Sequence, residues 1–152
     1  MFHLDSRIEK DSSLVASLQL CQLRIQNDQR YPWLVLVPVV QNQDGSQITE
    51  VHELSIQESQ QLMHESNVVA ATLKKVTGAK KINVANLGNV CSQLHWHVVA
   101  RFENDLTWPG PIWGVGQAEQ WNEKKRHDLV TSLLKVLADK DSSLIKETFL
   151  PN

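Results

Sequence analysis

The sequence predicts an α+β domain in which a mainly antiparallel sheet carries a main helix and a C-terminal helix. The expected order of elements is strand, strand, helix, strand, strand and helix, which is typical of this class. Residues 93–101 alternate as in a half-buried strand, and residues 55–78 carry the start and stop signals of a helix. At 152 residues the chain has the size of one domain. We therefore expect a single domain over 1–152, with its core between about residues 15 and 105.

The first two strands are expected on either side of a turn. Alternation over Leu18–Ile25 indicates a strand, and 27–30 is predicted as a turn because Asn and Asp bond their own backbone there. Trp33–Val37 is apolar on both faces, as in a central strand. Pro38 ends it, since proline cannot donate to a ladder. Residues 41–49 form a surface turn.

Two helices are predicted from their caps and from apolar periodicity. Ser55 is a natural N-cap, Glu58 completes a capping box, and Gly78 is the expected C-cap. The second helix is expected over about Glu123–Ala138. The buried faces are marked by Leu62, Ser66, Val69, Leu73 and Val76 in the first helix and by Leu129, Val130, Leu133, Leu134 and Leu137 in the second.

The region between the helices contains two more strands and an irregular segment. Lys81–Leu87 indicates a strand, Gly88-Asn89 a turn, and Gln93–Arg101 the next strand. Residues 105–114 cannot be helical, because they contain two prolines and two glycines.

Composition describes a soluble globular protein, with 41% hydrophobic and 21% charged residues. The net charge of -2 gives no field to hold a polyanion, so we expect no nucleic-acid partner. The longest apolar stretch, Trp33–Val40, is far shorter than the roughly 20 residues of a membrane span, so we expect no membrane partner. Cys21 and Cys91 are too few for a disulfide framework and fit two reduced thiols in a cytoplasmic protein.

The most informative residues are Gln93, His95 and His97. Because side chains on a strand alternate, these three share one face, while Leu94 and Trp96 share the other. Two imidazoles and an amide side by side form a chemical surface. The alternatives are a pair of satisfied polar residues or a metal site, for which Cys91 and Gln93 are imperfect further ligands.

Three segments carry a resemblance to a known family. Gln93–Val99 resembles the signature of the histidine triad (HIT) superfamily, His-φ-His-φ-His-φ-φ with φ apolar, with glutamine in the first place. Asn86-Leu87-Gly88 resembles the Asn-x-Gly that precedes this signature, and Trp33–Pro38 resembles the family's apolar strand ending in proline. The resemblance covers roughly residues 20–101 and implies the HIT-like fold.

The resemblance implies nucleotide chemistry. His95 matches the nucleophile that attacks the α-phosphate and forms a nucleotidyl-imidazole, which water then releases. An imidazole with a pKa near ~6.5 offers a free lone pair at cytosolic pH, provided that a backbone carbonyl holds its other nitrogen as a donor. His97 matches the histidine that contacts the phosphate, for charge stabilisation or proton delivery. Gln93 supports the pocket by hydrogen bonding, but an amide cannot carry a proton.

Two departures from the family bear on the leaving group. Gly88-Asn89-Val90 stands in place of Gly-Gln-Ser or Gly-Gln-Thr, whose hydroxyl helps to protonate the leaving group. Positioned acid catalysis of this kind is typically worth ~10²–10⁴-fold. Tyr31-Pro32-Trp33 stands where a histidine often precedes the apolar strand. A pyrophosphate-type leaving group demands less, because it is already a stable anion.

The resemblance also predicts the binding residues and the partners. Asn27 or Asp28 is expected to bond the ribose hydroxyls, and Asn27 is the better fit by pattern. Asn86, Gly88 and Asn89 are expected to position the nucleotide, although a turn explains Asn86 equally well. Trp108-Pro109-Gly110 is expected to border the pocket or to join the core. The expected substrates are nucleoside phosphoramidates, dinucleoside polyphosphates or nucleotide sugars, and the expected assembly is a homodimer with no cofactor and no metal. The first competing hypothesis is a nucleotide-binding module that has lost catalysis, and the second is a metal-dependent hydrolase.

Overall fold

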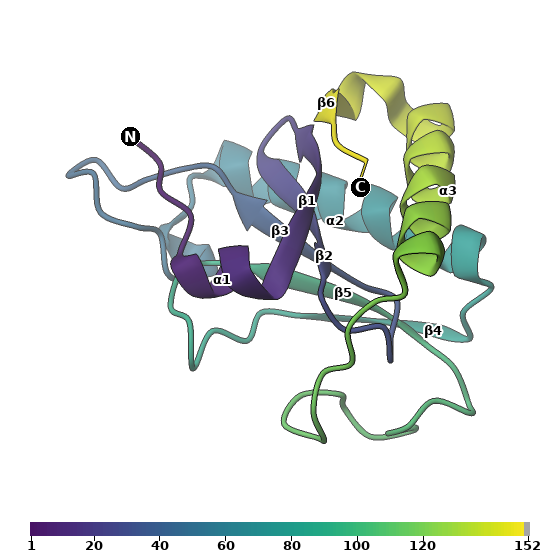
Figure 1. Cartoon of the computed structure of the whole chain (residues 1–152). Coiled ribbons are helices and arrows are strands. Elements are labelled where there is room, and N and C mark those ends of the chain that lie inside the picture. The colour runs from purple at the N-terminus through teal and green to yellow at the C-terminus, as the bar shows by residue number, and fades with distance from the viewer. Residues whose placement is uncertain (151–152) are drawn as a thin grey trace.

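A computed structural model describes residues 1–150 and confirms the α+β fold (Figure 1). Its six strands form one sheet in the order β4-β5-β3-β2-β1-β6, and the paired strands are antiparallel. The strands are β1 (Ser12–Leu18), β2 (Cys21–Gln26), β3 (Trp33–Pro38), β4 (Lys81–Ala85), β5 (Trp96–Arg101) and β6 (Ile145–Thr148). The helices are α1 (Ser6–Asp11), α2 (Ile56–Thr77) and α3 (Glu123–Asp141), with 3₁₀ turns at Val51–Glu53 and Ser142–Leu144. The expected domain also includes Pro151 and Asn152, which lie outside the described residues.

The two faces of the sheet have different covers. On β3, Leu34 and Leu36 join the large core that the sheet forms with α2 and α3. Val35 and Val37 point the other way, toward a smaller cluster with Ile8 of α1. Figure 1 shows α2 behind the sheet and α1 in front of it. The long helices α2 and α3 therefore cover one face of the sheet, and the short helix α1 and loops lie on the other face.

The predicted caps and buried face of α2 are confirmed. The Ser55 hydroxyl accepts from the Glu58 N–H at 3.2 Å, and the Glu58 carboxylate accepts from the Ser55 N–H at 2.8 Å. Gly78 ends the helix in the left-handed region, with φ of 68°. Ser66 is a polar residue on this buried face, and its hydroxyl is satisfied there because it accepts from the Trp96 indole N–H at 2.9 Å.

The expected strand over Leu18–Ile25 corresponds to β2 but starts too early, and β1 before it was not expected. β1 ends at Leu18, and β2 begins at Cys21 as its hairpin partner. The connection lacks the usual turn residues. Glu65 of α2, which is fully buried, accepts instead from the Leu20 N–H at 2.6 Å and the Cys21 N–H at 3.0 Å. A carboxylate from a distant helix thus stabilises the turn, which local sequence does not reveal.

The histidine strand is shorter than predicted, since β5 begins at Trp96 and not at Gln93. Trp96 is the first residue that pairs with β3, and His97 is the first that pairs with β4. Before them no strand lies alongside, so the Leu94 N–H bonds to the Ile48 carbonyl at 2.9 Å. The alternation of polar and apolar residues therefore continues upstream of Trp96, although those residues form no ladder of hydrogen bonds with β3 or β4.

The segment between β5 and α3 is irregular, as predicted, and ion pairs hold it in place. Arg101 is buried and bonds the Asp105 carboxylate through two nitrogens, at 2.7 and 2.9 Å. Arg30 bonds Asp28 at 2.7 Å and the Val115 carbonyl at 2.8 Å. These contacts fix the segment beside the β2–β3 turn. No helix within residues 1–150 has the length and hydrophobicity needed to cross a membrane.

Candidate active site

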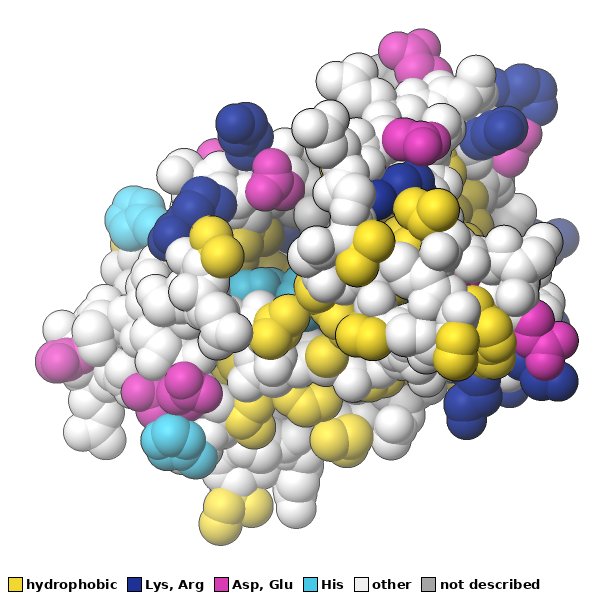
Figure 2. Space-filling model, turned by 90° about the horizontal axis from the view of Figure 1, so that it is seen from below, with side chains coloured by type: hydrophobic (Ala, Val, Ile, Leu, Met, Phe, Trp, Pro, Cys, Tyr) yellow, Lys and Arg dark blue, Asp and Glu magenta, His cyan; other side chains and the backbone are white. Residues whose placement is uncertain are grey.

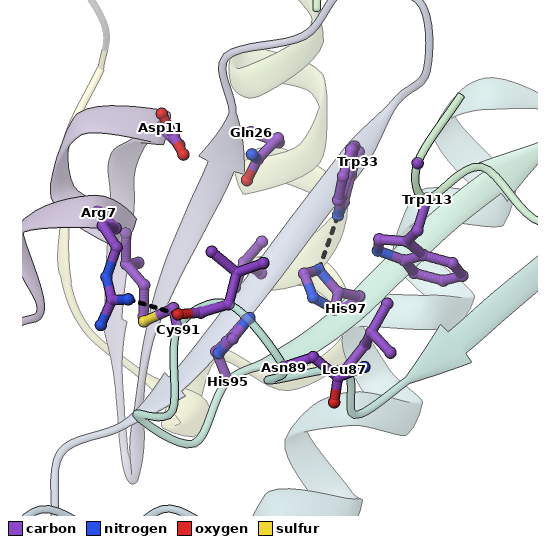
Figure 3. A pocket seen from close by; sticks show the side chains of 14 residues that line it. Arg7, Asp11, Gln26, Trp33, Leu87, Asn89, Cys91, His95, His97 and Trp113 are labelled. Atoms are coloured by element: carbon purple, nitrogen blue, oxygen red, sulfur yellow. Dashed lines mark hydrogen bonds between the residues drawn. The ribbon is translucent and has the colours of Figure 1, made fainter. Parts of the chain in front are cut away.

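A cavity of about 490 Å³ opens on the face of the sheet that the long helices leave free. Figure 2 shows histidine side chains inside a hollow ringed by hydrophobic side chains. In Figure 3, Arg7 and Trp113 lie on opposite sides, with His95 and His97 between them. The volume is within the usual range for small-molecule sites. The lining residues are Arg7, Ile8, Asp11, Gln26, Trp33, Val35, Leu87, Asn89, Val90, Cys91, His95, His97, Trp113 and Gly114.

His95 is held by its own segment. Its Nδ1 lies 2.6 Å from the Gln93 carbonyl oxygen. A carbonyl only accepts, so Nδ1 must carry the proton and the Nε2 lone pair stays free. The ring is 7% exposed and lines the cavity. The predicted backbone hold on this imidazole is confirmed.

His97 is held by a neighbouring strand. The Trp33 indole N–H donates to His97 Nδ1 at 3.0 Å, as the dashed line in Figure 3 marks. An indole only donates, so this Nδ1 must be unprotonated and the neutral ring carries its proton on Nε2. The centroids of the His95 and His97 rings are 4.8 Å apart, and the rings meet edge to face.

The surroundings of His97 favour its neutral form. Burial and the neighbouring His95 lower the pKa of His97 to about 4, against a backbone hydrogen bond at Leu87 that raises it. The cause is that a charged imidazolium loses hydration when it is buried. At neutral pH His97 is therefore an uncharged hydrogen-bond donor.

Gln93 does not line this cavity. Its amide oxygen accepts from the Asp5 N–H at 2.8 Å, and its amide nitrogen donates to the His3 carbonyl at 2.9 Å. The side chain therefore joins the N-terminal segment to the histidine segment. Its place supports a role in organising the pocket and gives it no direct contact with a ligand in the cavity.

One wall of the cavity comes from α1, a helix that the sequence did not predict. Asp5 is the N-cap of this helix and accepts from the Arg7 N–H at 2.9 Å. The Arg7 guanidinium pairs with the Asp5 carboxylate at 2.7 Å and also bonds the Val90 carbonyl. This arginine holds the pKa of Asp5 well below its usual range. An N-cap before a short helix was the available signal, but nothing local places that helix beside His95.

The loop between β4 and β5 separates two cavities. Asn89 borders the main cavity, whereas Asn86 and Gly88 border a smaller one of about 230 Å³, which Asn89 also lines. A Cβ on Gly88 would lie 3.0 Å from the Cys91 carbonyl oxygen, so any other residue there would require the loop backbone to shift by a few tenths of an ångström. Burial, and next the nearby Asp5, raise the pKa of Cys91.

Asn27 lies outside both cavities. Its amide bonds the Ser13 hydroxyl and the Lys10 carbonyl, each at 3.1 Å, and so ties β2 to the end of α1. The predicted ribose contact is not supported by this position. Gln26, the last residue of β2, lines the main cavity instead.

The predicted tryptophan segment is adjacent to the cavity through a different residue. Trp108 lies outside the cavity, with the Arg101 guanidinium 5.8 Å from its ring centroid. Trp113 lines the cavity, and its ring centroid lies 5.4 Å from that of His97. Within residues 1–150, no group of three or more His, Cys, Asp and Glu side chains is arranged to hold a metal ion.

Comparison with known proteins agrees with this site and fold. The HIT domain matches residues 7–104, so the chain belongs to the HIT family. Among the curated proteins none matched the chain.

Solved structures of HIT proteins resemble this chain over most of its length. A histidine triad protein from Sinorhizobium meliloti is 47% identical, with a TM-score of 0.84, and the match covers 89% of this chain and 96% of that one. One from Marinobacter aquaeolei is 34% identical, with a TM-score of 0.85 and coverage of 91% and 98%. One from Bradyrhizobium japonicum is 33% identical, with a TM-score of 0.85 and coverage of 90% and 98%.

Proposed function

We propose that this protein is a nucleotide hydrolase or transferase that cleaves at the α-phosphate through a covalent nucleotidyl-His95. The observation that supports it most is the hydrogen bond from His95 Nδ1 to the Gln93 carbonyl. This bond leaves the Nε2 lone pair unprotonated on a ring that lines a cavity of nucleotide size. A positioned nucleophile splits one hard displacement into two easier ones.

The proposed reaction balances without a cofactor. His95 Nε2 forms a bond to phosphorus, and the bond to the leaving group breaks with its electron pair. The imidazole becomes cationic, and its proton stays on Nδ1, hydrogen-bonded to the Gln93 carbonyl oxygen. Water then attacks phosphorus and loses a proton to solvent, and the nitrogen–phosphorus electron pair returns to Nε2. His97 Nε2–H donates to the phosphoryl oxygens during both steps, which is electrostatic stabilisation by a fixed donor.

The lack of a strong proton donor among these residues determines the leaving group that we propose. Gln93 lies outside the cavity, His97 is neutral, and Val90 stands where the family hydroxyl belongs. Nothing in this set readily protonates an amine or an alkoxide as it departs. We therefore propose substrates with a phosphoanhydride bond, such as dinucleoside polyphosphates, ahead of phosphoramidates.

The test compares two adenylated substrates of matched base and sugar. Diadenosine tetraphosphate should be turned over faster than adenosine 5′-phosphoramidate, and His95→Asn should abolish both reactions. His52→Asn is the matched control, since His52 is exposed and lies outside the cavity. Turnover that is unchanged in His95→Asn contradicts the mechanism, and a preference for the phosphoramidate contradicts the proposed substrate class.

A second candidate is a nucleotide-binding module without turnover. The same lack of proton donors favours it, together with Trp33 and Trp113, whose rings line the cavity and offer faces to a purine. Calorimetry with adenosine monophosphate separates the candidates. Binding without turnover of either substrate identifies a module, whereas no binding contradicts both.

We also propose a homodimer. Strand β4 lies at one edge of the sheet, and Val84 on it is 43% exposed. An edge strand offers unpaired backbone groups to a second copy. Light scattering should give twice the mass of the chain, and Val84→Lys should lower it; a single-chain mass for the unaltered protein contradicts the proposal.

A further inference from the structure

We infer that Trp33 is a positioning residue, whose indole N–H holds His97 in the tautomer that carries its proton on Nε2. The structural part of this inference stands on the contacts alone. Its consequence for turnover rests on the proposed function.

The contact follows from strand register. Val35 lies opposite His97 and Trp33 lies opposite Val99, so Trp33 and His97 are diagonal neighbours on adjacent antiparallel strands. Long side chains reach each other at this spacing. The indole nitrogen and His97 Nδ1 are 3.0 Å apart, which is an ordinary hydrogen-bond length. The ring centroids are 5.5 Å apart, with the planes tilted by 56°.

The indole is the only side-chain partner of His97 Nδ1 that the described residues supply. His95 and Trp113 approach the same imidazole as rings, 4.8 and 5.4 Å away between centroids. The indole N–H of Trp113 has no partner among the described residues, so Trp113 packs against the His97 ring without fixing the tautomer of His97.

The charged and titratable groups around the cavity do not replace this contact. They are His95, Cys91, Asp11 and Arg7. The guanidinium of Arg7 is already paired with the carboxylate of Asp5. The side-chain hold on His97 Nδ1 therefore comes from a group that cannot titrate, because an indole N–H neither gains nor loses a proton in water near neutrality. The backbone hydrogen bond of His97 at Leu87 does not titrate either.

The consequence is a fixed role for His97. A histidine at position 33 could take up a proton and pass it on, whereas an indole cannot. Protonating His97 Nδ1 would also place two N–H groups against each other. Trp33 thus keeps His97 as a hydrogen-bond donor to phosphoryl oxygens and prevents its use as an acid for the leaving group. This agrees with the proposed preference for leaving groups that depart as anions.

The first test needs no variant and no substrate. In ¹⁵N-labelled full-length protein, a scalar coupling should be detected between the Trp33 indole nitrogen and His97 Nδ1, through the hydrogen bond. The His97 nitrogen shifts should show Nδ1 as the unprotonated nitrogen. A His97 whose proton sits on Nδ1, or the absence of the coupling from well-resolved signals, overturns the inference.

The second test compares two tryptophan variants. Trp33→Phe removes the donor, and the midpoint for protonation of His97 should rise by about one pH unit in NMR titrations. Trp113→Phe is the matched control, because it changes a ring on the same imidazole and removes no hydrogen bond. A Trp33→Phe midpoint equal to that of the unaltered protein, or matched by Trp113→Phe, contradicts the inference.

Kinetics then separate this inference from the proposed function. Trp33→Phe should lower kcat roughly 2- to 10-fold, the scale of one hydrogen bond, and move the acid limb of the pH–rate profile to higher pH, whereas KM changes less. If the unaltered protein shows no turnover but the NMR results hold, the proposed function fails and the role of Trp33 stands. If turnover is normal and the His97 NMR signals of Trp33→Phe match those of the unaltered protein, the role of Trp33 fails and the proposed function stands.

Discussion

His95 and His97 lie next to each other, but different parts of the molecule hold them. His95 precedes β5 and donates to the carbonyl of Gln93, two residues before it. His97 lies inside β5 and accepts from Trp33 on β3. One ring therefore carries its proton on Nδ1 and the other on Nε2. The first arrangement is local, whereas the second depends on the register of two strands.

This difference assigns the two rings separate tasks. A free Nε2 lone pair makes His95 the nucleophile of the pair, and an Nε2–H makes His97 the donor. Neither assignment could come from the His-x-His spacing, which is the same for both residues. The four predictions below test this contrast, from the largest expected effect to the smallest.

The largest effect is expected from removing the nucleophile. His95→Asn should lower turnover on the order of 10⁴–10⁶-fold, the scale seen when a covalent nucleophile is lost. Acid-quench mass spectrometry should detect a nucleotidyl adduct in the unaltered protein and none in His95→Asn. An adduct that maps to His97 would reverse the two assignments.

Removing the donor should cost less and should leave the adduct. His97→Ala is expected to lower kcat by roughly 10²–10³-fold, which is typical of one lost donor to a developing charge. His97→Gln keeps an N–H and should lose less. Single-turnover kinetics with adduct detection checks this order, and failure of His97→Ala to form any adduct would contradict the division of tasks.

Neutral, buried His97 should make stability depend on pH. Its folded pKa of about 4 lies below the ordinary value of 6.5, so between these values the unfolded chain binds more protons. The contribution of neutral His97 to the free energy of unfolding is fully present above pH 6.5 and is lost as the pH falls toward 4. The loss is about 2 kcal/mol between pH 7.5 and pH 5. Urea unfolding should show that His97→Gln loses less over this interval. Equal losses in the two proteins would contradict the burial argument.

The smallest effect is expected at Gln93. Gln93→Ala leaves the Asp5 N–H and the His3 carbonyl without their partners, which should reduce the free energy of unfolding by about 1–2 kcal/mol. Gln43→Ala is the control, since Gln43 is exposed in a turn. Limited proteolysis should cut the N-terminal segment faster in Gln93→Ala. A loss of turnover comparable to that of His95→Asn would instead show a direct part in the reaction.

Much of the fold was predictable because its signals are local. Ser55, Glu58 and Gly78 mark the ends of α2 through contacts within one helical turn, and the apolar run of β3 identifies a central strand. The β1–β2 turn was missed because Glu65, from another element, bonds its N–H groups. The start of β5 was misplaced because a ladder needs a partner strand, and alternation says nothing about partners.

The candidate site divides in the same way. His95 and His97 were identified from spacing, since a strand sets which side chains share a face. Arg7 and Trp113 were not assigned to the cavity, because helix α1 and a loop bring them there from positions far apart in the sequence. Asn27 does not reach the cavity, because it follows the end of β2 and its side-chain amide bonds Ser13 and Lys10 instead.

The sequence by itself determined the fold class, the long helices, the central strand and the shared face of two histidines, because each depends on residues close together in the chain. Only the tertiary structure decided which nitrogen of His97 carries the proton, what the Gln93 side chain bonds, and which residues enclose the cavity. Those outcomes depend on hydrogen bonds between residues far apart in sequence, such as Trp33 with His97 and Asp5 with Gln93. Such bonds form only after the strands take their register and α1 settles against the sheet.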